Sequence, residues 1–193
     1  MISAANGDII ELVRSQDLGC IVNPANATMS EGGALCGQIY READSGLLTA
    51  AEVSVKGIGE GSSVLTKGFK LCEYIIHTLA PRDTSYKKWE RLQSCYLSIL
   101  DIAGRLQEGG YIHTVAIPAI GTGVFNLPAR QADEIAYTTI RDWQDTMSHG
   151  LDVVLCFQEQ VRWQAMLDRG AFHFTWDDIN YGELRLAEGG YGE

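Results

Sequence analysis

Short apolar segments rich in branched residues recur along the chain, and stretches with helical periodicity separate them. Four of these segments predict strands buried on both faces of a sheet: residues 19–23, 74–78, 114–118 and 151–156. Apolar residues three and four positions apart predict helices over residues 33–43 and 89–106, and a further helix that begins near residue 129. Because strands and helices alternate, the sequence predicts an α/β fold: a three-layer α/β/α sandwich around a central sheet.

The length and composition fit one globular domain. The chain has 193 residues, of which 46% are hydrophobic, so a second full domain would not fit. We expect a domain over residues 1–170 and an acidic, glycine-bearing extension over residues 171–193, loosely held at its end. No apolar run approaches the roughly 20 residues needed to cross a bilayer, and the first residues lack the features of a signal peptide. We therefore expect a cytoplasmic monomer.

The charge and the cysteines exclude several classes of function. A formal net charge of −10 argues against binding to a nucleic-acid backbone or an anionic membrane, because both require a basic surface. A small anionic ligand held by backbone N–H groups remains compatible with this charge. The five cysteines include no CxxC pair and no nearby histidine, so we expect reduced thiols, no metal site and no cofactor.

The segment after the strand that ends at Val22 has an unusual composition. It contains two asparagines, Asn23 and Asn26, and the pair Gly32-Gly33 before a predicted helix. Open α/β sheets bind ligands at the carboxyl ends of their strands, and glycine lets the backbone approach a bound group closely. The same residues also suit an ordinary strand-to-helix connection, in which asparagine forms the turn.

A second segment of this kind contains Gly121-Thr122-Gly123, which follows another buried strand. Its N–H groups could line a concavity that suits a diphosphate without lysine or arginine, although a lone GxG also suits a turn. Asp8 fits either a helix cap or an acceptor for the amino group of a ligand. We interpret His77, at the end of a strand, as a structural residue.

Together these segments resemble the macro domain family, whose members bind ADP-ribose. The resemblance covers about residues 1–168 and is carried by these motifs: Gly7-Asp8-Ile9, Val22-Asn23-Pro24-Ala25-Asn26 with Gly32-Gly33 and Cys36-Gly37, Tyr74-Ile75-Ile76-His77-Thr78, and Pro118-Ala119-Ile120-Gly121-Thr122-Gly123-Val124-Phe125. The chain is most similar to the branch that removes mono-ADP-ribose from proteins. The resemblance implies a mixed central sheet.

The resemblance also implies a set of site residues. Asp8 would bind the adenine amino group, the two glycine-rich loops would enclose the phosphates, and Asn26 and Phe125 would contact the distal ribose. The ligand-binding residues that it implies are Asp8, Ile9, Asn23, Ala34, Leu35, Cys36, Gly121, Thr122, Gly123, Val124 and Phe125. Those that it implies at the reacting ribose are Asn26, Gly32, Gly33 and Phe125.

One position departs from the branch. Many of its hydrolases have an aspartate ten positions after the second asparagine, where this chain has Cys36. A neutral thiol is a poor proton acceptor beside a diphosphate, so we expect no nucleophilic catalysis by Cys36. The hypothesis that follows is positional: the loops bend the ligand, a water lies near the Gly32-Gly33 wall, and Asn26 fixes the ribose. The bond broken would be the ester between mono-ADP-ribose and an acidic residue of a protein.

Two other functions stay open at this stage. The first is a module that binds ADP-ribose or ADP-ribosylated protein without turnover, which the Cys36 departure favours. The second is a hydrolase of ADP-ribose metabolites, such as a 1''-phosphate or an O-acetyl ester, that uses the same pocket. Both predict binding of ADP-ribose, so only turnover on defined substrates separates them from the first hypothesis.

Overall fold

The structure is a computed structural model that describes residues 1–52, 57–146 and 150–174. Its strands are β1 (Ile2–Asn6), β2 (Cys20–Pro24), β3 (Ser63–Lys67), β4 (Tyr74–Thr78), β5 (Thr114–Pro118), β6 (Asp152–Phe157) and β7 (Phe172–His173). Its helices are α1 (Ile9–Ser15), α2 (Ala34–Ala43), α3 (Ser45–Glu52), α4 (Lys88–Glu108), α5 (Ala129–Thr146) and α6 (Gln160–Asp168). Within these described ranges, no helix is both long enough and apolar enough to span a membrane.

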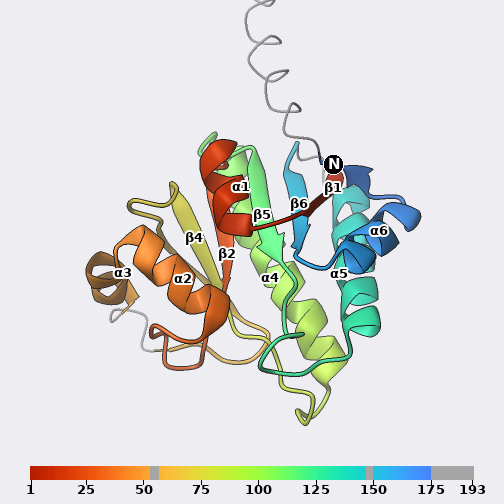
Figure 1. The fold of residues 1–193 in the computed structure, drawn as a ribbon, viewed down its shortest axis with the longest axis horizontal. Coiled ribbons are helices and arrows are strands. Elements are labelled where there is room, and N and C mark those ends of the chain that lie inside the picture. The colour runs from red at the N-terminus through yellow and green to blue at the C-terminus, as the bar shows by residue number, and fades with distance from the viewer. Residues whose placement is uncertain (53–56, 147–149, 175–193) are drawn as a thin grey trace, which may run out of the picture.

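In the described part of the chain, seven strands form one sheet in the order β3-β4-β2-β5-β6-β1-β7. β3 runs antiparallel to β4, and the other neighbouring pairs are parallel. Helices cover both faces of this sheet (Figure 1). The structure therefore confirms the predicted α/β sandwich and its mixed sheet.

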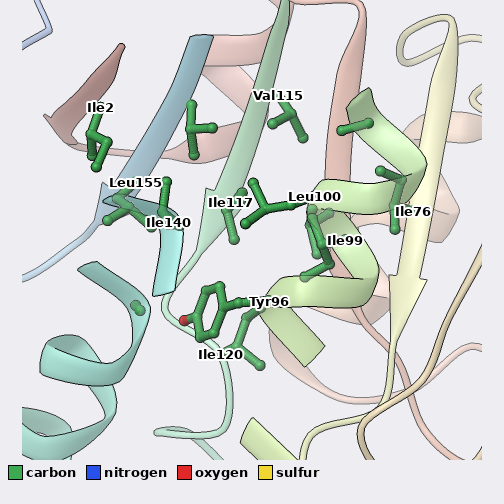
Figure 2. Close-up of a cluster of buried hydrophobic side chains, with 14 of the residues drawn as sticks. Ile2, Ile76, Tyr96, Ile99, Leu100, Val115, Ile117, Ile120, Ile140 and Leu155 are labelled. Carbon is green, nitrogen blue, oxygen red and sulfur yellow. The ribbon is translucent and has the colours of Figure 1, made fainter. Parts of the chain in front are cut away.

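Two apolar cores hold the three layers together. Along β2, Cys20 and Val22 join the core beneath α4, α5 and α6, whereas Ile21 joins the core beneath α1, α2 and α3. Residues of a strand alternate between the two faces of a sheet, so a continuous apolar run supplies both cores. Figure 2 shows the first core, where Leu100 of α4 lies beside Ile117 of β5.

The connections that follow β2 and β5 lead to opposite faces of the sheet. These two strands are parallel neighbours, so both following loops begin at the same edge of the sheet. The loop after β2 leads into α2 on one face, and the loop after β5 leads into α5 on the other. In open α/β sheets, the ligand crevice lies where successive connections separate in this way.

Several elements are not predicted by the hydrophobic pattern. β1 has the sequence Ile-Ser-Ala-Ala-Asn, with one branched apolar residue, and the edge strand β3 is half-exposed. Helix α6 buries Met166 alone among its residues, so its apolar periodicity is weak. β7 is two residues long and pairs with Ser3 and Ala4. The sheet therefore extends past residue 170, where we placed the end of the domain, and the acidic stretch 177–193 lies outside the described residues.

Candidate functional site

The first candidate loop, residues 25–33, closes on the side chain of Asn26. Asn26 Nδ2 donates to the Ser30 carbonyl at 2.7 Å, and Asn26 Oδ1 accepts from Thr28 Oγ1 at 2.8 Å and from the Ser30 amide at 3.2 Å. These bonds fix the plane of the Asn26 amide. An amide nitrogen carries two hydrogens, and the described residues use one of them through Ser30. The other can donate to a ligand hydroxyl.

Asn26, Gly32 and Cys36 meet at one point of this loop. A Cβ atom on Gly32 would lie 3.1 Å from Asn26 Nδ2 and 3.7 Å from Cys36 Sγ. The buried Cys36 thiol donates to the Ser30 carbonyl at 3.8 Å, the same oxygen that accepts from Asn26. The thiol is therefore directed at the loop backbone and supports the loop that carries Asn26.

The first loop ends at the start of α2. Gly33 is the N-cap of this helix, and among the described residues no side chain caps it and none lies within 4 Å of a Cβ atom placed on Gly33. Ala34 is exposed and has a φ of +37°, and Leu35 is half-buried. The first N–H groups of a helix attract anions. An exposed α2 N-terminus beside Gly33 is thus suited to a phosphate.

The second candidate loop follows β5 and is folded tightly on itself. Gly121 has a φ of +79°, and a Cβ atom there would lie 2.5 Å from Leu127 Cδ1. The Leu127 amide donates to the Gly121 carbonyl at 3.0 Å, and the Asn126 amide donates to the Gly123 carbonyl at 2.9 Å. Gly123 has open space at its Cβ position. The loop therefore needs glycine at 121 for its shape, while glycine at 123 leaves its surface unobstructed.

Phe125 lies between this loop and the segment that follows β4. Its carbonyl accepts from the Asp83 amide at 2.9 Å, and the Arg82 guanidinium carbon is 5.0 Å from its ring centroid. The ring is half-buried against the core, whereas the neighbouring Val124 side chain is 83% exposed. Phe125 is thus held in place on the loop, while Val124 can contribute mainly its backbone.

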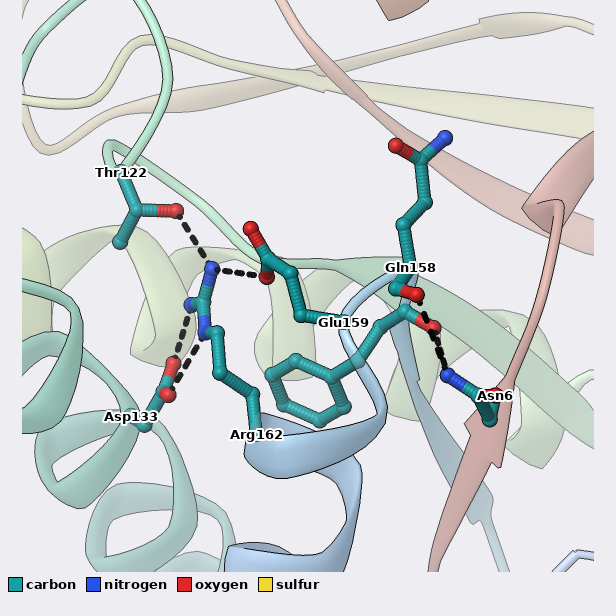
Figure 3. A network of polar contacts seen from close by, with 7 residues as sticks. Asn6, Thr122, Asp133, Gln158, Glu159 and Arg162 are labelled. Carbon is teal, nitrogen blue, oxygen red and sulfur yellow. Dashed lines mark hydrogen bonds and ion pairs between the residues drawn. The ribbon is translucent and has the colours of Figure 1, made fainter.

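A mostly buried arginine connects the second loop to the helices beneath it (Figure 3). Arg162 of α6 donates to both carboxylate oxygens of Asp133 on α5, at 2.9 Å and 2.5 Å, and to Thr122 Oγ1 at 3.1 Å. Glu159 Oε2 lies 3.1 Å from the same Nη1. Burial alone would lower the pKa of Arg162, but hydrogen bonds and charges from Asp133 and Glu159 raise it. The guanidinium is therefore protonated at all ordinary pH values.

Asp8 lies at the entrance to α1. Its Oδ1 accepts from the Ile10 amide at 2.7 Å, which confirms the helix-cap interpretation, and its Oδ2 accepts from Gln38 Nε2 of α2 at 3.4 Å. Asp8 and Gln38 line a groove of about 410 Å³ between α1 and α2. Ile9 is buried in the core, so its backbone is the part that can face a ligand. The carboxylate stays accessible at the groove for an amino group.

The structure places Asn23, which we expected to contact a ligand, in the interior of the sheet. Asn23 is fully buried in β2, and its Nδ2 lies 3.0 Å from Nδ1 of His77 on β4. His77 Nε2 lies 2.8 Å from Thr66 Oγ1 of β3. Since parallel pairing places Asn23 directly opposite His77, Asn23 Nδ2 is paired inside the sheet, while the buried Asn23 Oδ1 has no hydrogen-bond partner among the described residues. His77 is accordingly the structural residue that we expected.

Sequence reasoning missed the residues that support the two loops. Gln38 of α2, Arg82 after β4 and Arg162 of α6 contact predicted site residues, and Asp133 of α5 holds Arg162 in place. Their positions carry no local motif. In the described part of the chain, no group of three potential ligands could hold a metal ion. No disulfide joins the five cysteines, all of which lie in that part.

A family model described as Macro domain matches residues 22–136, which is more than half of the chain. The chain belongs to the macro domain family. A macro domain-containing protein of Xanthomonas axonopodis pv. citri is 35% identical over 167 residues, which cover 82% of this chain and 89% of that protein. The ADP-ribose glycohydrolase MACROD1 of Mus musculus is 34% identical over 161 residues, which cover 80% of this macro domain and 47% of that protein.

Solved macro domains have the same fold. The Oceanobacillus iheyensis macrodomain with ADP has a TM-score of 0.73 and 28% identity, with 86% of this chain and 89% of that chain covered. The Trypanosoma brucei macrodomain in complex with ADP-ribose has a TM-score of 0.70 and 25% identity, with 86% and 67% covered. These comparisons confirm the resemblance seen in the sequence.

Proposed function

We propose that this macro domain binds ADP-ribose and hydrolyses the ester that links mono-ADP-ribose to acidic residues of proteins. One observation carries the proposal: two glycine-containing loops begin at the carboxyl ends of the adjacent strands β2 and β5 and lead to opposite faces of the sheet. Relatives support it, since one is named an ADP-ribose glycohydrolase and another is solved with ADP-ribose. Binding and hydrolysis require different parts of the site.

The phosphates would be held by backbone amides. The N-terminal amides of α2 at Gly33, Ala34 and Leu35 face them from one loop, and Gly121–Val124 faces them from the other. Such amides solvate a diphosphate without a cationic side chain, which fits a net charge of −10. The Asp8 carboxylate would accept from the adenine amino group at the other end of the ligand.

The distal ribose would lie between Asn26 and Phe125. The Asn26 amide can donate its second Nδ2 hydrogen to a ribose hydroxyl, and the Phe125 ring packs against the sugar. Structures of the Oceanobacillus iheyensis macrodomain include variants at an asparagine, at a glycine seven positions later and at an aspartate ten positions after that asparagine. Asn26, Gly33 and Cys36 have the same spacing here, which supports their place at the ligand.

The chemistry would depend on position more than on a protein base. A water beside the Gly32-Gly33 wall attacks the anomeric carbon, the bond from that carbon to the ester oxygen breaks, and the carboxylate leaves with the electron pair. The proton of the water passes to a ligand phosphate or to solvent. A carboxylate needs little protonation to leave, and orientation of the reactants can lower a barrier by several kcal/mol.

Cys36 favours a second candidate function, a macro domain that binds ADP-ribose without turnover. Cys36 stands where the Oceanobacillus relative has the aspartate that was varied, and its thiol donates to the Ser30 carbonyl. It therefore contributes no general base at the reacting carbon. Both functions use the same ligand contacts, so the rate of ester cleavage distinguishes them.

The experiment measures release of ADP-ribose from a protein that is modified on aspartate or glutamate. We expect release by the wild type and a rate lower by about ten- to hundredfold for Asn26→Ala, because the ribose loses its orienting amide. Gln93→Ala, which removes an exposed amide on α4, is the matched control and keeps the wild-type rate. If the wild type binds ADP-ribose but releases none from the modified protein, the result supports the non-catalytic module. Equal rates of release for Asn26→Ala and wild type would exclude the role of Asn26.

A further inference from the structure

We propose that Arg162 is a positioning residue for the diphosphate loop: anchored on Asp133, it fixes Thr122 and thereby sets the shape of Gly121–Val124. The inference rests on the proposed function, since it concerns the loop that would hold the diphosphate. Arg162 belongs to α6, about forty residues beyond this loop, and no motif of the sequence points to it. Its importance follows from the contacts shown in Figure 3.

The anchor of this arrangement is a two-point ion pair between the buried Asp133 and the mostly buried Arg162. The side chains of Arg162 and Asp133 are 12% and 8% exposed, and Nε and Nη2 each donate to one carboxylate oxygen. A planar guanidinium bound at two points cannot rotate without losing both bonds. The ring of Phe157, with its centroid 5.3 Å from the guanidinium carbon, covers one side of the group. The third nitrogen, Nη1, is therefore held at a defined position beneath the loop.

Thr122 receives its orientation from this nitrogen. Arginine carries donors and no acceptor, so Thr122 Oγ1 accepts from Arg162 Nη1 in the 3.1 Å bond. The hydrogen of the Thr122 hydroxyl then points away from Arg162. The hydroxyl becomes a donor, and the acceptors that the proposed ligand brings to this loop are phosphate oxygens. Arg162 thus directs both the Thr122 side chain and the backbone that carries it.

The charges indicate that Arg162 acts through Thr122 and not as a counter-ion of the phosphate. Its positive charge faces Asp133 and Glu159, which together carry two negative charges. The local sum of these three groups is negative, so it does not attract a diphosphate. Loss of the arginine should consequently impair the binding of the phosphate part of the ligand through loop geometry, while the adenosine part, at Asp8 between α1 and α2, is unaffected.

The test uses two variants and one control. Thr122→Val removes the hydroxyl and keeps the ion pair, and the double variant Arg162→Met with Asp133→Leu removes both charges, so that no unpaired charge stays buried. Glu159→Gln changes the exposed acceptor of Nη1 and keeps the bonds to Asp133 and Thr122. Affinities for ADP-ribose and for adenosine are measured by titration, and hydrogen exchange is measured at the backbone amides of residues 121–124.

We expect ADP-ribose to bind about tenfold more weakly to both variants, with adenosine affinity changed less than about twofold. In the double variant the amides of residues 121–124 exchange faster, and Glu159→Gln behaves as wild type. Wild-type affinity for ADP-ribose in both variants would overturn the proposal, as would an equal loss for both ligands, which marks a general structural defect. If the double variant does not fold, hydrogen exchange in Thr122→Val decides: faster exchange of residues 121–124 supports the proposal, and unchanged exchange overturns it.

Failure of the proposed function has a different signature. It appears as absence of ADP-ribose binding in the wild type itself. The exchange rates then decide the positioning role without any ligand: faster exchange of residues 121–124 in the double variant supports it, and unchanged exchange overturns it.

Discussion

Among the individual residues, the buried pair of Asn23 and His77 determines how β2 and β4 are joined inside the sheet. Replacement of His77 by phenylalanine keeps a ring but removes the partner of Asn23 Nδ2 and one of the two partners of Thr66 Oγ1, which still donates to the Lys67 carbonyl. We expect the free energy of unfolding to fall by about 1–3 kcal/mol, because buried polar groups lose their hydrogen bonds. Urea unfolding measures this change. His113→Phe, at an exposed histidine, is the control, and an equal change in both variants would contradict the account.

Residue types could be recognised from the sequence, but their partners could not. Asn23 and Asn26 are three positions apart in the same motif, and we expected both to contact the ligand, Asn26 at the reacting ribose. Parallel pairing with β4 turns Asn23 inward to His77, whereas Asn26 lies past the end of the strand, in the loop. Asp8 shows the same limit, since its cap bond is local and predictable, while Gln38 reaches it from another helix. The ligand roles of Asp8 and Asn26 stay predictions.

At the scale of elements, the junction between the first loop and α2 depends on a close backbone approach. A Cβ atom on Gly37 would lie 2.4 Å from the Gly32 carbonyl oxygen, so Gly37→Ala must displace the loop or the helix. We expect the free energy of unfolding to fall by about 1–3 kcal/mol. Because Gly32 and Gly33 shift, we also expect the affinity for ADP-ribose to fall by up to about tenfold.

The control for this variant is Gly46→Ala in α3. Of the atoms in the described ranges, Asp44 Oδ1 at 3.6 Å is the nearest to its Cβ position, and alanine favours a helix by up to about 1 kcal/mol. Thermal unfolding and titration of ADP-ribose, applied to both variants, separate the effects. If Gly37→Ala retained wild-type stability and affinity, the close approach would not be needed for the site.

Elements that bury a continuous apolar stripe were predictable, and those at the edges were not. The strands β2, β4, β5 and β6 and the helices α2, α4 and α5 have such stripes, and their order defines the loops of the site. Helix α6 has only a short apolar stripe, in which Met166 is buried and Trp163 and Leu167 are partly buried. Arg162 was therefore not predicted as a site residue, although it contacts a loop that the sequence predicts to bind the ligand.

For the whole molecule, burial of thiols makes stability depend on alkaline pH. Burial raises the pKa of Cys72 from 9.0 to about 12, and burial also raises the pKa of Cys20, Cys95 and Cys156. Above pH 9 the unfolded chain loses these protons while the folded chain keeps them, so the free energy of unfolding falls as pH rises. The Cys72 thiol alone contributes a loss of about 1.4 kcal/mol by pH 10.

Urea unfolding in the presence of a reductant, at pH 7 and at pH 10, measures this dependence. Cys72→Ala removes one titrating group, so its loss of stability between the two pH values is smaller than that of wild type by about 1.4 kcal/mol. The comparison uses the difference between pH values, which cancels any effect of the substitution itself. An equal pH dependence in the two proteins would show that burial does not hold the Cys72 proton.

The central claim is that two loops, at the ends of β2 and β5, both bind ADP-ribose through their backbone amides. The most direct measurement is a titration of the protein with ADP-ribose, followed through the NMR shifts of every backbone amide. The account predicts saturable, one-to-one binding, with the largest shifts at residues 32–35 and 121–124. Absence of saturation at millimolar ADP-ribose, or shifts confined to one of the two loops, would contradict it.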